Sequence, residues 1–176
     1  MPAYHSTFLA EDASDTRVVG NFAIFPIKTQ FRGPSYPCHS DYDIIDECLD
    51  LFRANSFFKN FEIKGPADRA LIYGILFISN CLSLLNSRTT EHDATRTLNN
   101  LSLDNFSIPG DIGFPLNSLY QSPNGKLESD LLRSYLQQFR QELSARLIER
   151  IYRDDKTKPS KYWLAFTRRR FMNKSL

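Results

Sequence analysis

The chain has 176 residues, of which 41% are hydrophobic and 24% charged, a composition that fits one globular core and excludes an intrinsically disordered protein. The net charge is only +2, which argues against a dedicated basic nucleic-acid binder. The charge is unevenly placed: residues 126–176 hold 13 basic and 6 acidic side chains, whereas residues 1–125 hold 9 and 14. This asymmetry suits contact with a differently charged surface.

Residues 1–40 predict an extended arm. The stretch VVGNFAIFPI at 18–27 is β-branched and aromatic, which is compatible with a short strand. Prolines and a glycine then interrupt the chain between residues 26 and 37. We expect this arm to lie over the rest of the chain rather than to form a sheet of its own. MPAYHSTFLAED lacks the basic and apolar segments of a signal peptide, so we do not expect one. The odd number and wide spacing of the three cysteines predict reduced thiols in a cytosolic protein.

Apolar spacing and breaking residues predict helices over 41–55, 66–87, 89–103, 126–152 and 159–171. Ser40 or Asp41 can cap the first of these helices, and Thr89 or Thr90 can cap the third. Pro159 can begin the last, because proline is tolerated in the first turn.

The segment 66–87 is the most informative of these. From Ala70 to Leu85 its apolar residues cover nearly all faces of a helix, so it is buried either in protein or in a membrane. The run is shorter than the roughly 20 apolar residues of a membrane span and is interrupted by polar ones. We therefore predict a central core helix surrounded by other helices, and no membrane insertion.

Residues 106–125 contain three prolines and three glycines together with many large apolar residues, which is typical of an ordered, packed loop. The sequence as a whole predicts a mainly α-helical single domain over residues 1–176. It comprises the extended arm at 1–40, a helical body at 41–171 and a basic tail at 172–176.

Sequence motifs for nucleotide binding or catalysis are absent: GxGxxG, GxxxxGK[ST], HExxH and GxSxG do not occur. The three cysteines do not have the spacing of a zinc site, and we expect Cys48 and Cys81 to pack as small hydrophobic residues. The histidines stand in polar stretches and are expected at the surface: His5, His39 and His92. We expect neither enzymatic activity nor a cofactor.

Four acidic residues share a face of the 41–55 helix: Asp43, Asp46, Glu47 and Asp50. Such a group could bind a metal or act in acid–base catalysis. We favour a solvated face whose charges complement the helix dipole. An acidic face that contacts a partner is a third interpretation, which we prefer to catalysis.

The strongest local signal is TRRRFMNKSL at 167–176. Arginine forms bidentate contacts with carboxylates and phosphates, and neighbouring apolar side chains complete the composition of an interface. The candidate partner-binding residues are Trp163, Arg168, Arg169, Arg170, Phe171, Met172 and Lys174. Two alternatives remain: cations that complement a helix C-terminus, or a nucleic-acid-binding module with a basic tail.

Several long stretches resemble one known family. They include MPAYHSTF, DYDIIDE, FRANSFFKNFEIKGPADRALIY, FSIPGDIGFPLNSLY, YLQQFRQE, KPSKYW and RRFMNKSL. These stretches extend over essentially the whole chain. They are similar to subunit 3, the 21-kDa subunit, of the actin-related protein 2/3 complex.

The resemblance implies a non-catalytic scaffold subunit of an assembly that starts actin filaments as branches. It implies packing mainly against actin-related protein 3, with the other subunits as further partners and filament actin as a candidate. Nucleic acid is not expected as a partner. The expected location is the cytoplasm, at the actin cytoskeleton. We expect the tail cations Arg168, Arg169, Arg170 and Lys174 to face an acidic surface of an actin-related neighbour or of filament actin.

Overall fold

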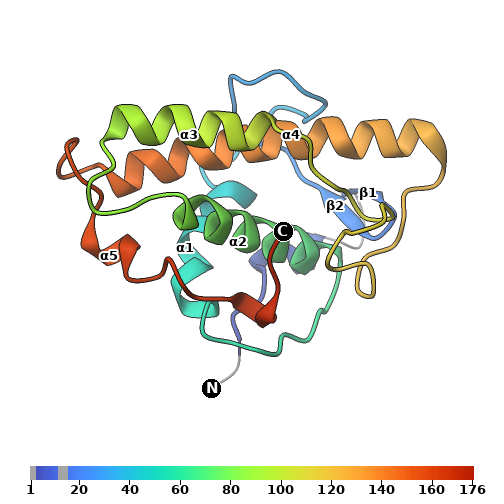
Figure 1. The fold of residues 1–176 in the computed structure, drawn as a ribbon. Coiled ribbons are helices and arrows are strands. Elements are labelled where there is room, and N and C mark those ends of the chain that lie inside the picture. The colour runs from blue at the N-terminus through green and yellow to red at the C-terminus, as the bar shows by residue number, and fades with distance from the viewer. Residues whose placement is uncertain (1–2, 12–15) are drawn as a thin grey trace.

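A computed structural model of the chain describes residues 3–11 and 16–176. At its centre lies helix α2 (Pro66–Ser83), in which every residue from Ala70 to Ile78 is buried. Helix α1 packs against α2, and the pair α3 and α4 covers another side (Figure 1). This confirms the predicted fold class, a mainly helical single domain around an apolar central helix. Within the described residues, no helix combines the length and hydrophobicity needed to cross a bilayer.

Helix α1 (Ile44–Asn55) lies very close to α2. A Cβ atom at Gly74 would overlap Cys48 Sγ, so the absent side chain of Gly74 is what lets the two helices approach. Asp43 caps α1, and a capping box joins it to Asp46. The predicted cap at Ser40 or Asp41 is therefore wrong by two or three residues. Cys48 and Cys81 are fully buried, as expected of small hydrophobic residues.

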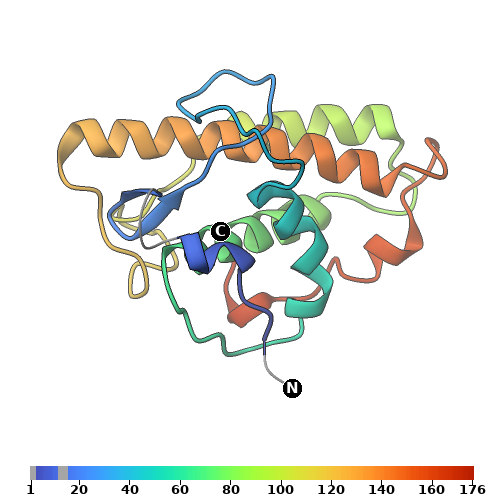
Figure 2. The same ribbon diagram turned by 180° about the vertical axis from the view of Figure 1, so that it is seen from behind.

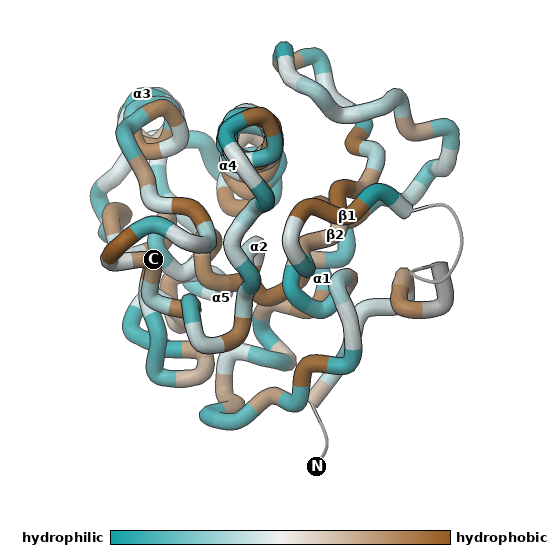
Figure 3. The backbone as a smooth tube through the Cα atoms, turned by 90° about the vertical axis from the view of Figure 1, so that its right-hand side faces the viewer, coloured by the Kyte–Doolittle hydropathy of each residue, from teal (hydrophilic) through white to brown (hydrophobic). Residues whose placement is uncertain are grey.

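Helices α3 (Glu91–Leu103) and α4 (Gly125–Ile151) run side by side, as the end-on view shows (Figure 3). Thr90 caps α3, which confirms one of the two predicted caps. The connection between the helices is ordered, as predicted. Its residues Ile108, Phe114, Leu116 and Tyr120 are buried, and the Tyr120 hydroxyl donates to the Arg69 carbonyl at 2.5 Å.

The N-terminal arm contains a hairpin of strands β1 (Arg17–Val19) and β2 (Phe22–Ile24), paired antiparallel (Figure 2). The expectation that the arm forms no sheet of its own is wrong. Gly20 has a φ of 61°, which suits the first position of a two-residue hairpin turn. Strand β2 is buried and packs against α2, so the hairpin covers part of the central helix.

The C-terminal segment departs most from prediction. Residues 159–171 do not form one helix: α5 covers only Lys161–Leu164, followed by turns and the 3-10 helix η2 (Phe171–Asn173). The Phe166 amide donates to the Trp163 carbonyl, and the Arg169 amide to the Phe166 carbonyl, so the chain continues in single turns. The unwinding allows Trp163 and Phe171 to be buried at two different places.

Candidate interaction surface at the C-terminal segment

Aromatic contacts fix the path of the C-terminal segment. Trp163 stacks on Phe52 of α1, with ring centroids 6.0 Å apart, and Phe171 packs edge-on against Phe61 at 5.7 Å. The Met172 amide donates to the Phe58 carbonyl at 3.0 Å. Met172 and the following residue adopt positive φ angles of 57° and 55°, which reverse the chain. The basic tail is therefore held on the body of the protein.

The seven candidate partner-binding residues divide by exposure. Trp163 and Phe171 are buried in the chain's own core, so their rings are not available at the surface. Met172 is half-buried. The four cationic residues are exposed: Arg168, Arg169, Arg170 and Lys174. The buried aromatic residues thus fix the segment that carries the exposed cations.

These cations border a groove of about 440 Å³ between α2 and the C-terminal segment. Its floor includes the polar residues of the second half of α2, namely Ser79, Asn80 and Ser83. Sequence reasoning did not assign these three residues to a site. The signal that marks them is the break in the apolar pattern of α2, because Ser79 and Ser83 are spaced to lie on one helix face.

The charge of this groove is not neutralised within the described part of the chain. Arg168, Arg170 and Lys174 form no ion pair or side-chain hydrogen bond there. The guanidinium of Arg169 lies over the Phe57 ring, 4.1 Å from its centroid. Unpaired guanidinium and ammonium groups beside hydroxyls and an amide can bind carboxylates or phosphates.

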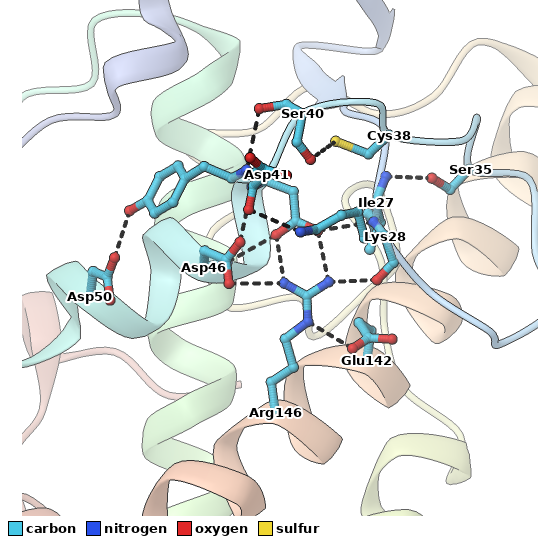
Figure 4. A network of polar contacts seen from close by, with 12 residues as sticks. Ile27, Lys28, Ser35, Cys38, Ser40, Asp41, Asp46, Asp50, Glu142 and Arg146 are labelled. Atoms are coloured by element: carbon cyan, nitrogen blue, oxygen red, sulfur yellow. Dashed lines mark hydrogen bonds and ion pairs between the residues drawn. The ribbon is translucent and has the colours of Figure 1, made fainter.

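The acidic residues of α1 have a different role. Arg146 Nη1 lies 2.7 Å from Asp43 and 3.1 Å from Asp46, and Arg146 Nε lies 2.7 Å from Glu142 (Figure 4). Burial alone would raise the pKa of Asp43. Hydrogen bonds from Arg146 and from the amides of Lys28 and Asp46 outweigh burial and hold that pKa below its ordinary value.

Two further carboxylates fasten the N-terminal segment. Glu47 accepts hydrogen bonds from the Ser6 and Thr7 hydroxyls, and the buried Asp68 contacts His5 Nδ1 at 2.7 Å. The predicted solvated acidic face is therefore wrong at Asp43 and Glu47, and His5 is not a free surface residue. Among residues 3–11 and 16–176, no three acidic, histidine or cysteine side chains are placed to hold a metal ion.

Comparison with known proteins identifies the family of the chain. The whole chain, residues 1–176, matches the family model P21-Arc, described as the ARP2/3 complex ARPC3 (21 kDa) subunit. The chain belongs to this family.

The similarity to individual members of the family extends over whole chains. A Saccharomyces cerevisiae protein named actin-related protein 2/3 complex subunit 3 is 65% identical, with 100% of both chains covered. The Schizosaccharomyces pombe protein of the same name is 58% identical, also over 100% of both chains. A Caenorhabditis elegans relative, named as the probable subunit 3, is 47% identical over 100% of this chain and 96% of its own. The resemblance recognised in the sequence is thus confirmed.

Proposed function

We propose that the chain is a non-catalytic scaffold subunit of the actin-related protein 2/3 complex, where it packs mainly against actin-related protein 3 and supports branch formation. The observation that carries this proposal is full-length similarity to proteins named as subunit 3 of that complex. The remaining subunits are the further partners, and filament actin is a candidate. The site of action is the cytoplasmic actin cytoskeleton.

The basic groove gives this function a physical means of contact. Its exposed cations Arg168, Arg170 and Lys174 have no acidic partner in the described part of the chain. A neighbour with an acidic surface would supply the missing counter-charge, and such complementarity fixes orientation and speeds association. We assign the groove to an acidic surface of an actin-related neighbour. Arg169 borders the same groove.

Zero-length cross-linking tests this assignment directly. A carbodiimide joins an amine to a carboxylate that touches it, and Lys174 is the only lysine in the last ten residues. The tagged full chain is purified with its assembly, cross-linked, and analysed by mass spectrometry. We expect recovery of two actin-related proteins and a fixed set of small subunits in equal ratio, with Lys174 joined to a carboxylate of actin-related protein 3.

The matched control is Lys174→Arg, which keeps the charge and removes the reactive amine, so that this one cross-link disappears. A chain recovered without actin-related proteins would contradict the scaffold function. Cross-links from Lys174 to other subunits only would contradict the assignment of the groove.

A further inference from the structure

A second cluster on the surface combines arginine with exposed aromatic rings. We call it the arginine–aromatic patch and define it as Arg53, Phe57, Tyr162 and Arg169. The Arg53 guanidinium lies over the Tyr162 ring, 3.5 Å from its centroid, and Arg169 covers Phe57. Tyr162 is 63% exposed and Phe57 is 54% exposed, so both rings present apolar area at the surface.

Arg53 has an unusual electrostatic position. Its guanidinium forms no hydrogen bond or ion pair with any described residue, and its Nη1 atom is shielded from solvent without a partner. Burial is the main reason that the pKa of Arg53 is lowered; Tyr162 opposes this lowering, and the charge of Arg150 adds to it. A cation that has lost part of its hydration without gaining a counter-charge lies in an unfavourable environment. A carboxylate placed against it would relieve this.

The patch is continuous with the proposed contact surface. Arg169 belongs both to the patch and to the border of the basic groove. Phe166 packs edge-on against Phe57 of the patch and against the buried Phe52, so the patch rests on the core. One partner surface could therefore cover both regions.

We propose that the arginine–aromatic patch binds a segment of a neighbouring subunit that presents a carboxylate beside an apolar side chain. The carboxylate would face the unpaired Arg53 guanidinium, and the apolar group would cover Phe57 and Tyr162. Arginine and aromatic residues together are the side chains that contribute most binding energy at protein interfaces. The proposal rests on the proposed function in one respect, which is that the partner belongs to the same assembly.

The patch fits a protein better than a nucleic acid. A binder of single strands offers ring faces on which bases stack. Here one face of each exposed ring, Tyr162 and Phe57, is already covered by a guanidinium group. With a net charge of only +2, the chain also gives little general attraction for a polyanion.

The test measures how fast the labelled full chain leaves the purified assembly when excess unlabelled chain is added. In Arg53→Met the charge is lost while an aliphatic side chain remains, and we expect dissociation to be about tenfold faster or more, because truncating a desolvated charge acts mainly on the off-rate. Arg53→Lys keeps the charge and should give an intermediate rate. The control Arg96→Met removes an exposed arginine of α3 and should dissociate like the wild type.

The response of the dissociation rate to salt distinguishes a role of Arg53 in binding from a role in the stability of the chain. We expect wild-type dissociation to accelerate with KCl concentration and Arg53→Met to respond less, whereas simple destabilisation would leave the response to salt unchanged. Tyr162→Ala, at an exposed position, should also dissociate faster.

Equal dissociation rates for the wild type and Arg53→Met would overturn the proposal for the patch and leave the scaffold function intact. Absence of the wild-type chain from the assembly would overturn both. Binding of the chain to phosphatidylserine vesicles that is lost in Arg53→Met would assign the patch to lipid instead.

Discussion

The acidic residues of α1 and the basic residues of the C-terminal segment are both clustered in the sequence, but the structure surrounds them differently. The acidic residues of α1 are paired within the protein, as the contacts of Asp43 with Arg146 and of Glu47 with Ser6 show. The basic residues of the C-terminal segment remain exposed, and Arg168 and Arg170 have no acidic partner among the described residues. The role of a charged cluster therefore depends on which residues the fold places next to it. The acidic region makes contacts within the fold, and we propose that the basic region meets a partner.

The largest expected effect tests the acidic region. Arg146→Met leaves the buried Asp43 carboxylate without its counter-charge and should lower the free energy of unfolding by about 3 kcal/mol. Arg146 is 16% exposed and Asp43 is 0% exposed at their side chains, so solvent cannot replace the lost contact. Urea denaturation of the isolated chain measures the change.

The matched control is Arg150→Met, which breaks the more exposed pair with Asp50 and should cost less than about 1 kcal/mol. Equal losses in the two variants would mean that the Arg146 network is no more important than a surface ion pair.

Glu47→Gln tests whether the acidic region also holds the N-terminal segment. The substitution keeps the shape but replaces one acceptor oxygen, so a hydrogen bond from Ser6 or Thr7 is lost. We expect a loss of about 1–3 kcal/mol in unfolding free energy. Hydrogen exchange should become faster at the Thr7 amide. Unchanged exchange there would show that Glu47 does not hold the segment.

The pH dependence of stability follows from the lowered pKa of Asp43. Because the folded pKa lies below that of the unfolded chain, the stabilisation is fully present above about pH 4. It is lost as the pH falls from there through the folded pKa. The urea midpoint of the wild type should therefore fall more steeply below this pH than that of Asp43→Asn. Parallel curves would contradict the role given to this carboxylate.

The smallest expected effect concerns the basic region. Arg168→Glu combined with Arg170→Glu should change the unfolding free energy by no more than about 0.5 kcal/mol, because both side chains are exposed and unpaired. A loss as large as that of Arg146→Met would show that these arginines serve the fold, and the contrast between the two regions would fail.

The parts of the fold that the sequence predicts are those that depend on local patterns. The central helix follows from an apolar pattern on all faces after Pro66. The C-terminal cations could likewise be found from the sequence, because Arg168, Arg169 and Arg170 are consecutive and Lys174 follows closely. Two failures are local, namely the hairpin of β1 and β2 and the cap at Asp43. The other failures concern contacts between distant residues. Arg146 and Asp43 are separated by 103 positions, and His5 and Asp68 by 63, so no local pattern shows that either pair exists.

The prediction of one helix over residues 159–171 is wrong for the same reason. Trp163, Leu164 and Phe166 have a spacing that allows a helix, but Phe171 packs against Phe61, which lies far away in the sequence. That contact, and the hydrogen bond from Met172 to Phe58, fix the chain in turns. Tertiary packing thus overrides a weak helical preference. The groove floor on α2 was missed because its polar residues gain a role only when the C-terminal segment covers them.

The contrast between the acidic and the basic region is tested most directly by changing Arg168 and Arg170 to glutamate. The measurement is the amount of chain that stays in the purified assembly at physiological salt. The comparison is Arg88→Glu with Arg96→Glu, which changes the net charge by the same amount at other exposed positions. We predict that the first variant is lost from the assembly and supports fewer filament branches, while the second behaves like the wild type. Retention and branching equal to the wild type in the first variant would contradict the assignment of the basic groove to a partner.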